Sequence, residues 1–320
     1  MNRSILTCLL LLYAPLLWGQ TEKLIVPSDM KQQTVITEPV TLLKGYLRAG
    51  TVLDYRVADR FYNSEGSKEY YNTSSWGSQS AYGIAFQYGI SDRMEVALIT
   101  EYMNNLQQAQ SLQIESKTNT SETISIKQKG IGLGDSHLEL RYQVIKEKEK
   151  RFSLTGRLML TIPTGEKNPR NIKSETQYDL PVGEGAYALG LNISARKVIY
   201  PYSFSGYISY TNNFTGTKIF NAITLAEKKF RLGNMFETGL SGNLHLNEWI
   251  VFGNELNYYS EGEGKIEDEP PVLSSWAISY EPRLVFQVHR FRFSESVKIP
   301  LKGLNVPADP LYIMIVQFVF

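Results

Sequence analysis

The feature that most constrains the fold is an alternation of apolar and polar side chains with a period of two residues. In the segment 46–57, Leu47 and Tyr55 alternate with Arg48 and Asp54. Successive side chains of a β-strand point to opposite faces, so such a segment has one apolar and one charged face. The alternation recurs in segments at residues 46–57, 82–88, 94–102, 138–144, 152–162, 187–193, 204–210, 236–246, 250–258, 276–286, 291–299 and 312–320.

The connections between these segments are alternately short and long. Residues 89–93, 146–150 and 247–248 form short turns, whereas 60–75 and 262–272 form long polar loops. Bacterial single-chain outer-membrane barrels have an even number of antiparallel strands, short periplasmic turns and longer extracellular loops. The sequence therefore predicts an all-β protein, a transmembrane antiparallel β-barrel of about 12 strands, with limits of roughly 10 and 14.

Composition fits this prediction. The formal net charge is +1 and the mean hydropathy is −0.23, values that an ordinary water-soluble chain also has. A transmembrane barrel has such an average because each lipid-facing residue is followed by one that faces the lumen. The near-neutral charge gives no basic excess for nucleic-acid binding, so no nucleic-acid partner is expected.

The first residues have the pattern of a secretory signal peptide. Arg3 precedes an apolar run from Ile5 to Trp18, which ends at the small residue Gly19. Because a membrane-spanning helix needs about 20 apolar residues, we expect residues 1–19 to be cleaved. The single cysteine, Cys8, would be lost with them.

Residues 20–41 then precede the first strand and are longer than a barrel needs. They are expected to be either an N-terminal periplasmic tail or a plug that folds into the lumen. Residues 42–320 are assigned to the outer-membrane β-barrel.

The other end of the chain has a terminal pattern of its own. Tyr312, Met314, Val316 and Phe318 alternate along the segment that ends in Phe320. This segment resembles the terminal strand of bacterial outer-membrane barrels. The resemblance implies location in the bacterial cell outer membrane, contact with its lipids, and recognition of the last strand by the barrel-assembly machinery.

Three glycine-rich motifs are more specific. They are "GIGLGDSHLELRYQ" at 130–143, "TIPTGEKN" at 161–168 and "VGEGAYALGL" at 182–191. Together they resemble a family of outer-membrane barrels labelled as putative components of the MetA pathway of phenol degradation. The matching residues are Gly132, Gly134, Asp135, Arg141, Tyr142, Ile162, Pro163, Thr164, Gly165, Gly183, Gly185, Leu189, Gly190 and Leu191, with isoleucine at 162 replacing the usual leucine.

The resemblance covers about residues 80–215 and implies a porin-like channel, distantly similar to the fatty-acid and toluene channels. The expected function is passive transport of small molecules, hydrophobic or aromatic ones among them. One alternative is a structural or partner-binding surface barrel with a closed lumen. A second, less favoured alternative is an outer-membrane lipid hydrolase.

Charged residues of both signs occupy the alternate positions that a barrel would turn inward. We expect these side chains to line the lumen, where they would either brace the wall or set the selectivity of a conduit. The candidate lumen-lining residues are Arg48, Asp54, Arg56, Glu95, Glu101, His137, Glu139, Arg141, Arg157, Glu281 and Arg283.

The adjacent Asp135, Ser136 and His137 have the residue types of a hydrolase triad. On a strand, however, Ser136 and His137 point to opposite faces and cannot share a proton. His245 and His289 have no serine at matching spacing on their own strands. We therefore expect no enzyme, no catalytic residue, no metal site and no cofactor.

Overall fold

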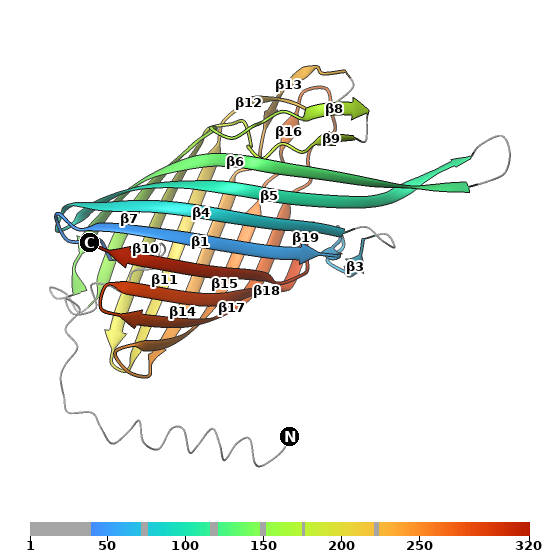
Figure 1. Ribbon diagram of the computed structural model, residues 1–320. Helices are drawn as coiled ribbons and strands as arrows, with labels where there is room; N and C mark the ends of the chain where they lie inside the picture. The colour runs from blue at the N-terminus through green and yellow to red at the C-terminus, as the bar shows by residue number, and fades with distance from the viewer. Residues whose placement is uncertain (1–39, 72–75, 116–120, 148–151, 175–176, 221–223) are drawn as a thin grey trace, which may run out of the picture.

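The computed structural model describes residues 40–71, 76–115, 121–147, 152–174, 177–220 and 224–320. Its main sheet has 14 strands. Two of them, β8 (Arg170–Ser174) and β9 (Gln177–Asp179), are short strands of a loop, and β9 pairs with β6. The other 12 form an antiparallel barrel (Figure 1). They are β1 (Leu47–Ala58), β4 (Trp76–Ser91), β5 (Met94–Glu115), β6 (Ser121–Ile145), β7 (Ser153–Ile162), β10 (Ala188–Ile199), β11 (Tyr202–Asn213), β14 (Met235–His245), β15 (Ile250–Glu261), β17 (Ser275–Val288), β18 (Phe291–Leu304) and β20 (Leu311–Val319).

The barrel is closed, because β1 pairs with both β4 and β20 and β5 pairs with β6. The predicted all-β fold and strand number are confirmed, and every expected segment overlaps one strand. At one end of the barrel lie short connections such as 200–201 and 289–290, which we call the turn end. The opposite end, called the loop end, carries the long connections. In outer-membrane barrels these ends face the periplasm and the cell exterior respectively.

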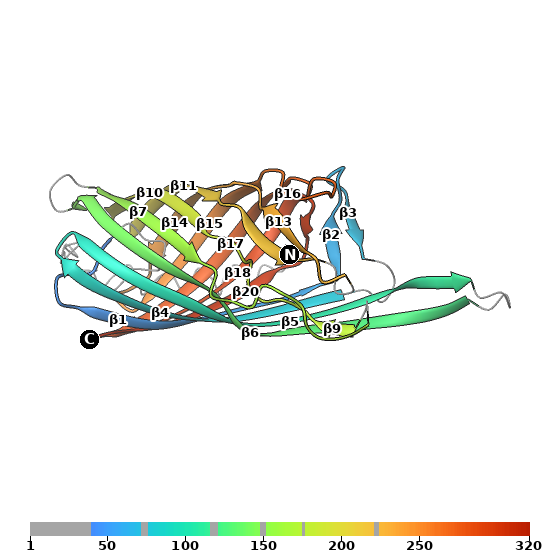
Figure 2. The same ribbon diagram turned by 90° about the horizontal axis from the view of Figure 1, so that it is seen from above.

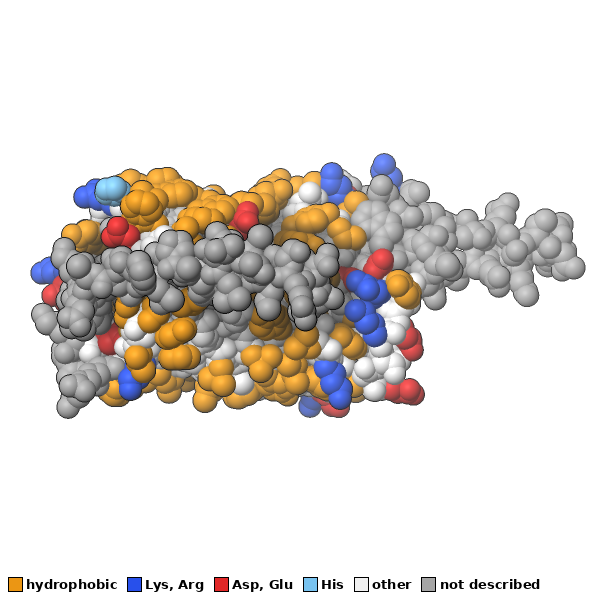
Figure 3. Space-filling model, turned by 90° about the horizontal axis from the view of Figure 1, so that it is seen from below, with side chains coloured by type: hydrophobic (Ala, Val, Ile, Leu, Met, Phe, Trp, Pro, Cys, Tyr) orange, Lys and Arg blue, Asp and Glu red, His pale blue; other side chains and the backbone are white. Residues whose placement is uncertain are grey.

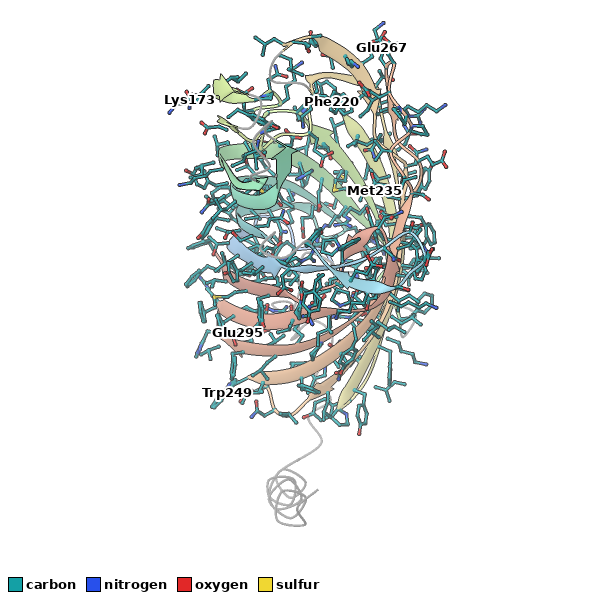
Figure 4. The ribbon with its side chains drawn as sticks, turned by 90° about the vertical axis from the view of Figure 1, so that its right-hand side faces the viewer. Lys173, Phe220, Met235, Trp249, Glu267 and Glu295 are labelled. Carbon is teal, nitrogen blue, oxygen red and sulfur yellow. The ribbon has the colours of Figure 1, made fainter. Side chains whose placement is uncertain are left out.

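The outer wall is apolar and the interior is polar, the reverse of a water-soluble protein. Large apolar side chains such as Leu191, Ile193 and Leu240 are exposed, whereas Arg48 and Arg141 are buried. Figure 3 shows apolar side chains along the middle of one face and most of the charged ones toward the two ends. Glu295 is an exception: it is exposed on the outer wall (Figure 4), between Leu284 of β17 and Met314 of β20.

Aromatic side chains mark the two rims of the apolar band. Tyr88 and Trp249 are exposed near the turn end. At the loop end, the ring of Tyr258 lies 6.3 Å from Phe236 and 6.5 Å from Trp276, measured between centroids. Amphipathic rings at both membrane–water interfaces are characteristic of outer-membrane barrels.

The hairpin of β5 and β6 is longer than the alternation predicts. The polar stretch after Tyr102 was expected to be a loop, yet the two strands stay paired out to Glu115 and Ser121. The hairpin projects beyond the rest of the loop end (Figure 2). The apolar alternation stops where the hairpin leaves the barrel wall, which is why this part of the strand pair was missed.

A β-bulge interrupts the same pair of strands inside the barrel wall. Thr100 pairs with Ser136 and Tyr102 with Leu133, so Gly134 and Asp135 together oppose the single residue Glu101. A bulge adds one residue to a strand and shifts its inside-outside alternation. Consequently Leu133 and Leu138 both point outward, although they lie five positions apart.

Short sheets organise the loops. One contains β2 (Arg60–Tyr62), β3 (Lys68–Tyr70) and β19 (Val306–Pro307), and another contains β12 (Gly216–Ile219), β13 (Glu227–Arg231) and β16 (Lys265–Ile266). The second sheet joins the loops that follow β11 and β15 near the rim (Figure 1). Among the described residues, no helix has the length and apolar content needed to cross a bilayer.

Candidate functional site

Four of the predicted lumen residues form one ion-pair network in the half of the interior nearer the turn end. Arg141 donates to Glu139 at 2.7 Å, and the Arg157 guanidinium lies 3.2 Å from the other oxygen of Glu139. Glu95, on the neighbouring strand, lies 3.6 Å from Arg141. All but Arg157 are almost fully buried. Each charge therefore has an opposite partner, which buried charges require to remain ionised.

Further buried polar pairs fill this turn half. Arg48 donates to the Gln87 side chain at 2.8 Å. Arg196 forms an ion pair with Glu147 at 3.3 Å. Gln87, Glu147 and Arg196 were not among the predicted lumen residues, although Arg196 occupies the same inward register as its neighbours on β10.

The chain just before β1 also enters the turn half. Thr41 and Leu42 are buried at 5% and 3% exposure. The Leu42 amide donates to Glu95 at 2.8 Å, and the Thr41 hydroxyl donates to Gln143 at 3.3 Å. The backbone of Leu42 and Leu43 packs directly against Gly89. A Cβ at position 89 would lie 2.0 Å from the Leu43 carbonyl oxygen. Residues 1–39, with the predicted signal peptide and most of the predicted plug, lie outside the described residues.

A second group of predicted residues meets on the opposite wall. Arg283 donates to Glu281 at 2.8 Å and to Glu255 at 3.3 Å. Glu255 lies on the adjacent strand β15 and was not among the predicted lumen residues. Asp54 and Arg56 of β1 belong to neither group, and each has one buried side-chain atom without a hydrogen-bond partner among the described residues.

At the loop half, the bulged Asp135 joins three segments of the chain. Its two carboxylate oxygens accept hydrogen bonds from the Gly165 amide at 2.9 Å and from the Glu184 amide at 2.8 Å. Thr164 also donates to the carbonyl of Gly134 at 3.2 Å. The three glycine-rich motifs of the sequence, far apart along the chain, therefore converge at the rim of the barrel.

Glycines make this convergence sterically feasible. A Cβ on Gly183 would lie 2.6 Å from the backbone of Gly165, and a Cβ on Gly165 would lie 2.8 Å from Gly183. No real Cβ approaches backbone atoms so closely, so neither position admits a side chain without displacing a loop. The Gly-Asp, Thr-Gly and Gly-Glu pairs of the motifs thus build one structural joint.

Beside this joint lies a cavity of about 540 Å³, which we call the vestibule. Seen from the loop end in Figure 4, it lies within the barrel on the side of Met235. Side chains from β5, β6, β7, β10, β11, β14 and β15 form its walls, together with loop residues. The lining residues are Glu101, Met103, Gly134, Asp135, His137, Met159, Thr161, Val182, Glu184, Ala186, Ala188, Thr211, Asn213, Leu232, Met235, Tyr259 and Glu261.

The remaining predicted residues, Glu101 and His137, belong to the vestibule. The Nδ1 atom of His137 is hydrogen-bonded to the Thr161 hydroxyl at 3.0 Å. The Ser136 hydroxyl is instead hydrogen-bonded to the hydroxyls of Thr100 and Thr164. Ser136 and His137 thus have separate partners, in agreement with the alternation argument.

A serine–histidine contact does occur elsewhere, between neighbouring strands. Ser203 of β11 lies 3.1 Å from the Nε2 atom of His245 of β14. The alternation within a single strand gives no information on a contact between neighbouring strands, so it does not predict this pair. Both side chains are 4% exposed, and the adjoining cavity of about 20 Å³ would not admit a lipid. Within the described residues, no group of three His, Cys, Asp or Glu side chains is placed to hold a metal ion.

A closed barrel of 12 antiparallel strands, with an apolar outer band and a polar interior, defines a transmembrane protein of the bacterial outer membrane. No family model and no curated protein match the chain. The specific resemblance to the MetA-pathway family therefore stays a sequence-based expectation.

Solved structures do match. The COG4313 outer membrane channel from Pseudomonas putida F1 has a TM-score of 0.69 at 12% identity, covering 90% of this chain and 100% of that one. The TodX deltaS2S3 mutant, a monoaromatic hydrocarbon channel, has a TM-score of 0.49 at 7% identity, covering 89% and 92%. The Ralstonia pickettii toluene transporter TbuX has a TM-score of 0.42 at 8% identity, covering 87% and 90%. The first match supports the barrel fold.

Proposed function

We propose that this protein is an outer-membrane channel that passes small molecules passively, and that hydrophobic or aromatic molecules are among them. The vestibule is the observation that carries the proposal. It is a cavity in the lumen at the loop end of the barrel, the end proposed to face the cell exterior. Methionines and aliphatic side chains line much of it. Pockets of this size and mixed polarity are typical of small-molecule sites.

The charged residues of the turn half would form the narrow part of the pathway. We propose that Arg48, Glu95, Glu139, Arg141 and Arg157, with Glu281 and Arg283 on the opposite wall, restrict passage and set selectivity. Rings of charged side chains act in this way in other pores. Asp54, Arg56, Glu101 and His137 would line the remainder of the lumen.

The experiment that tests the channel is liposome swelling with uncharged solutes of graded size and polarity. We expect small solutes to enter proteoliposomes and large ones to be excluded. Liposomes prepared with heat-denatured protein serve as the control. Swelling no faster than in these control liposomes, for every solute, would overturn the proposal.

Residues 20–41 are proposed to act as a partial plug rather than as a free periplasmic tail. The burial of Thr41 and Leu42 beside Glu95 supports this, because it brings the end of the segment into the lumen. Deleting residues 21–41 is expected to raise the single-channel conductance. An unchanged conductance would contradict the plug.

A surface barrel with a closed lumen is the second candidate function. Two observations favour it: the dense packing of the turn half, and the long β5–β6 hairpin that projects outward (Figure 2). The swelling experiment separates the two candidates, since a closed lumen passes no solute. The hydrolase alternative has less support, because the buried Ser203–His245 pair has no room for a substrate.

The last strand is proposed to be the segment that the barrel-assembly machinery recognises. β20 closes the barrel against β1, and the exposed Phe320 side chain lies at the turn end. We expect Phe320→Ala to lower the amount of protein in the outer membrane, while Phe318→Ala, at an equally apolar position, serves as the comparison. Equal membrane levels of all three proteins would contradict the proposal.

A further inference from the structure

The vestibule has a marked charge asymmetry. Four carboxylates line it, those of Glu101, Asp135, Glu184 and Glu261, and none of its lining residues is a lysine or an arginine. Lys218 lies close by and donates to the Gly183 carbonyl at 3.3 Å. One ammonium beside four carboxylates leaves an excess of negative charge, so the vestibule favours a cation over an anion.

Two of the four carboxylates form no hydrogen bond or ion pair among the described residues. Asp135 is occupied by two backbone amides, and Glu261 accepts a hydrogen bond from Tyr259 at 2.7 Å. Among the described residues, by contrast, no side chain forms a hydrogen bond or an ion pair with the carboxylate of Glu101 or Glu184. These two carboxylates are available to a ligand.

An amide on the wall of the vestibule offers a further acceptor to a ligand. Asn213 lines the vestibule and is only 6% exposed, and its Nδ2 atom donates to the Gly233 carbonyl at 2.6 Å. No donor within the described part of the chain reaches its side-chain oxygen. This oxygen is not among the described side-chain atoms that are buried without a partner, so it is open to the vestibule and can accept a hydrogen bond from a solute.

Glu184 is exposed to solvent, yet the protein atoms on one side of its side chain desolvate the carboxylate in part. This desolvation, followed by the repulsion of Asp135, raises the pKa of Glu184 above its ordinary value. A ligand that carries a positive charge would relieve both effects.

The rest of the lining shows what kind of cation fits. Met103, Met159, Met235, Val182 and Leu232 form an apolar surface facing the same space. A small hydrated metal ion gains nothing from thioether and aliphatic groups, and the carboxylates do not converge into a metal-binding group in the described residues. An organic cation with an apolar body uses both parts of the lining.

We infer that the vestibule binds small cationic amphiphiles, molecules in which a protonated amine is joined to an apolar or aromatic group. The negative charge of the lining carboxylates attracts the ammonium, which donates to Glu101 or Glu184, while the apolar body lies against the methionines. This inference rests on the proposed channel function, because it names the class of molecule that enters the pathway.

Binding to the full-length protein in an uncharged detergent tests the inference. Calorimetry compares phenethylamine, 2-phenylethanol and phenylacetate, which share a phenylethyl-like body and differ in charge. We expect phenethylamine to bind roughly tenfold more tightly than the alcohol, because two or more carboxylates act on one charge, and phenylacetate to bind least. Equal affinity for amine and alcohol, or tighter binding of the acid, would overturn the inference.

Variants locate the site. The double change Glu101→Gln and Glu184→Gln is expected to abolish the preference for the amine, and each single change to reduce it about two- to fivefold. Glu263→Gln is the matched control, since Glu263 is exposed on a loop and does not line the vestibule. Amine preference retained in the double variant would show that the cation binds elsewhere.

A measurement on the unmodified protein covers the case in which a variant fails to fold. Phenethylamine added from the loop side of a planar bilayer is expected to block the potassium current at lower concentration than when added from the turn side. Equal block from both sides would overturn the inference. Absence of any current would instead overturn the channel function, so the two failures are distinguishable.

Discussion

The turn half and the loop half of the barrel interior are formed largely by the same strands, yet their charges are arranged differently. In the turn half, Glu139 lies between Arg141 and Arg157, and every oxygen of this carboxylate is used. In the loop half, Glu101 and Glu184 face a cavity of about 540 Å³. Inward carboxylates therefore brace the wall at one end and remain available to solutes at the other.

The two halves differ because different side chains lie next to the inward carboxylates. Near the turn end, arginines on β6 and β7 lie within reach of the carboxylates on β5 and β6. Near the loop end, the same strands contribute Met103, Met159 and Thr161 instead. The same strands can thus form a filled section near one end of the barrel and an open section near the other.

The largest expected effect comes from breaking the turn-half network. Glu139→Leu would leave Arg141 and Arg157 buried without their shared carboxylate, at a cost of about 3 to 5 kcal/mol in the free energy of unfolding. Denaturant unfolding in lipid vesicles measures it. Glu295→Leu, on the outer wall, is the matched control and should not destabilise. Equal stability of Glu139→Leu and the parent protein would show that the network does not brace the wall.

The joint at the loop end should be the next most sensitive region. Gly183→Ala places a methyl group about where the Gly165 backbone lies, and overpacking of this kind costs about 1 to 3 kcal/mol. We expect lower stability and faster proteolysis of the loop after β7. Gly156→Ala is the control, because a Cβ there meets no atom within 4 Å. Identical behaviour of the two variants would contradict the proposed role of the joint.

A charge-neutralising change in the loop half should alter selectivity rather than stability. Glu101→Gln removes a carboxylate that has no ion pair among the described residues, so its effect on the unfolding free energy should lie within about 0.5 kcal/mol. The reversal potential in a potassium chloride gradient should shift toward lower cation preference. If Glu101→Gln destabilises as much as Glu139→Leu, the two halves do not differ as described.

The smallest effect is a pH dependence that arises from Glu184. Burial and the Asp135 charge raise the pKa of Glu184 in the folded protein, so this carboxyl becomes neutral at a higher pH than an ordinary one. Cation preference should fall on acidification from neutral pH toward about pH 4, and less so in Glu184→Gln.

The stability effect of Glu184 has the opposite direction. A raised folded-state pKa contributes stability below the unfolded pKa, and this contribution is lost as the pH rises through the folded value. Unfolding midpoints of the parent protein and Glu184→Gln, compared across this range, test the sign. A parent protein that loses stability relative to the variant on acidification would contradict it.

Much of the fold follows from the sequence alone. Except across the bulge of β6, the two-residue period predicts which side chains face lipid and which face the lumen. The alternation of turn lengths predicts the antiparallel topology. Both are local properties of a strand and its nearest turn, so they can be read from residues such as Leu47 to Tyr55 without knowledge of any distant contact. The three glycine-rich motifs were also visible, although not what joins them.

The tertiary structure decided which inward residues meet. The pairing of Ser203 with His245, of Arg196 with Glu147 and of Asp135 with the amides at 165 and 184 joins residues tens of positions apart. Such contacts depend on the stagger between neighbouring strands and on the bulge at Gly134 and Asp135, which no local pattern specifies. For this reason the sequence predicts a polar lumen, while only the closed barrel divides it into a paired turn half and an acidic vestibule.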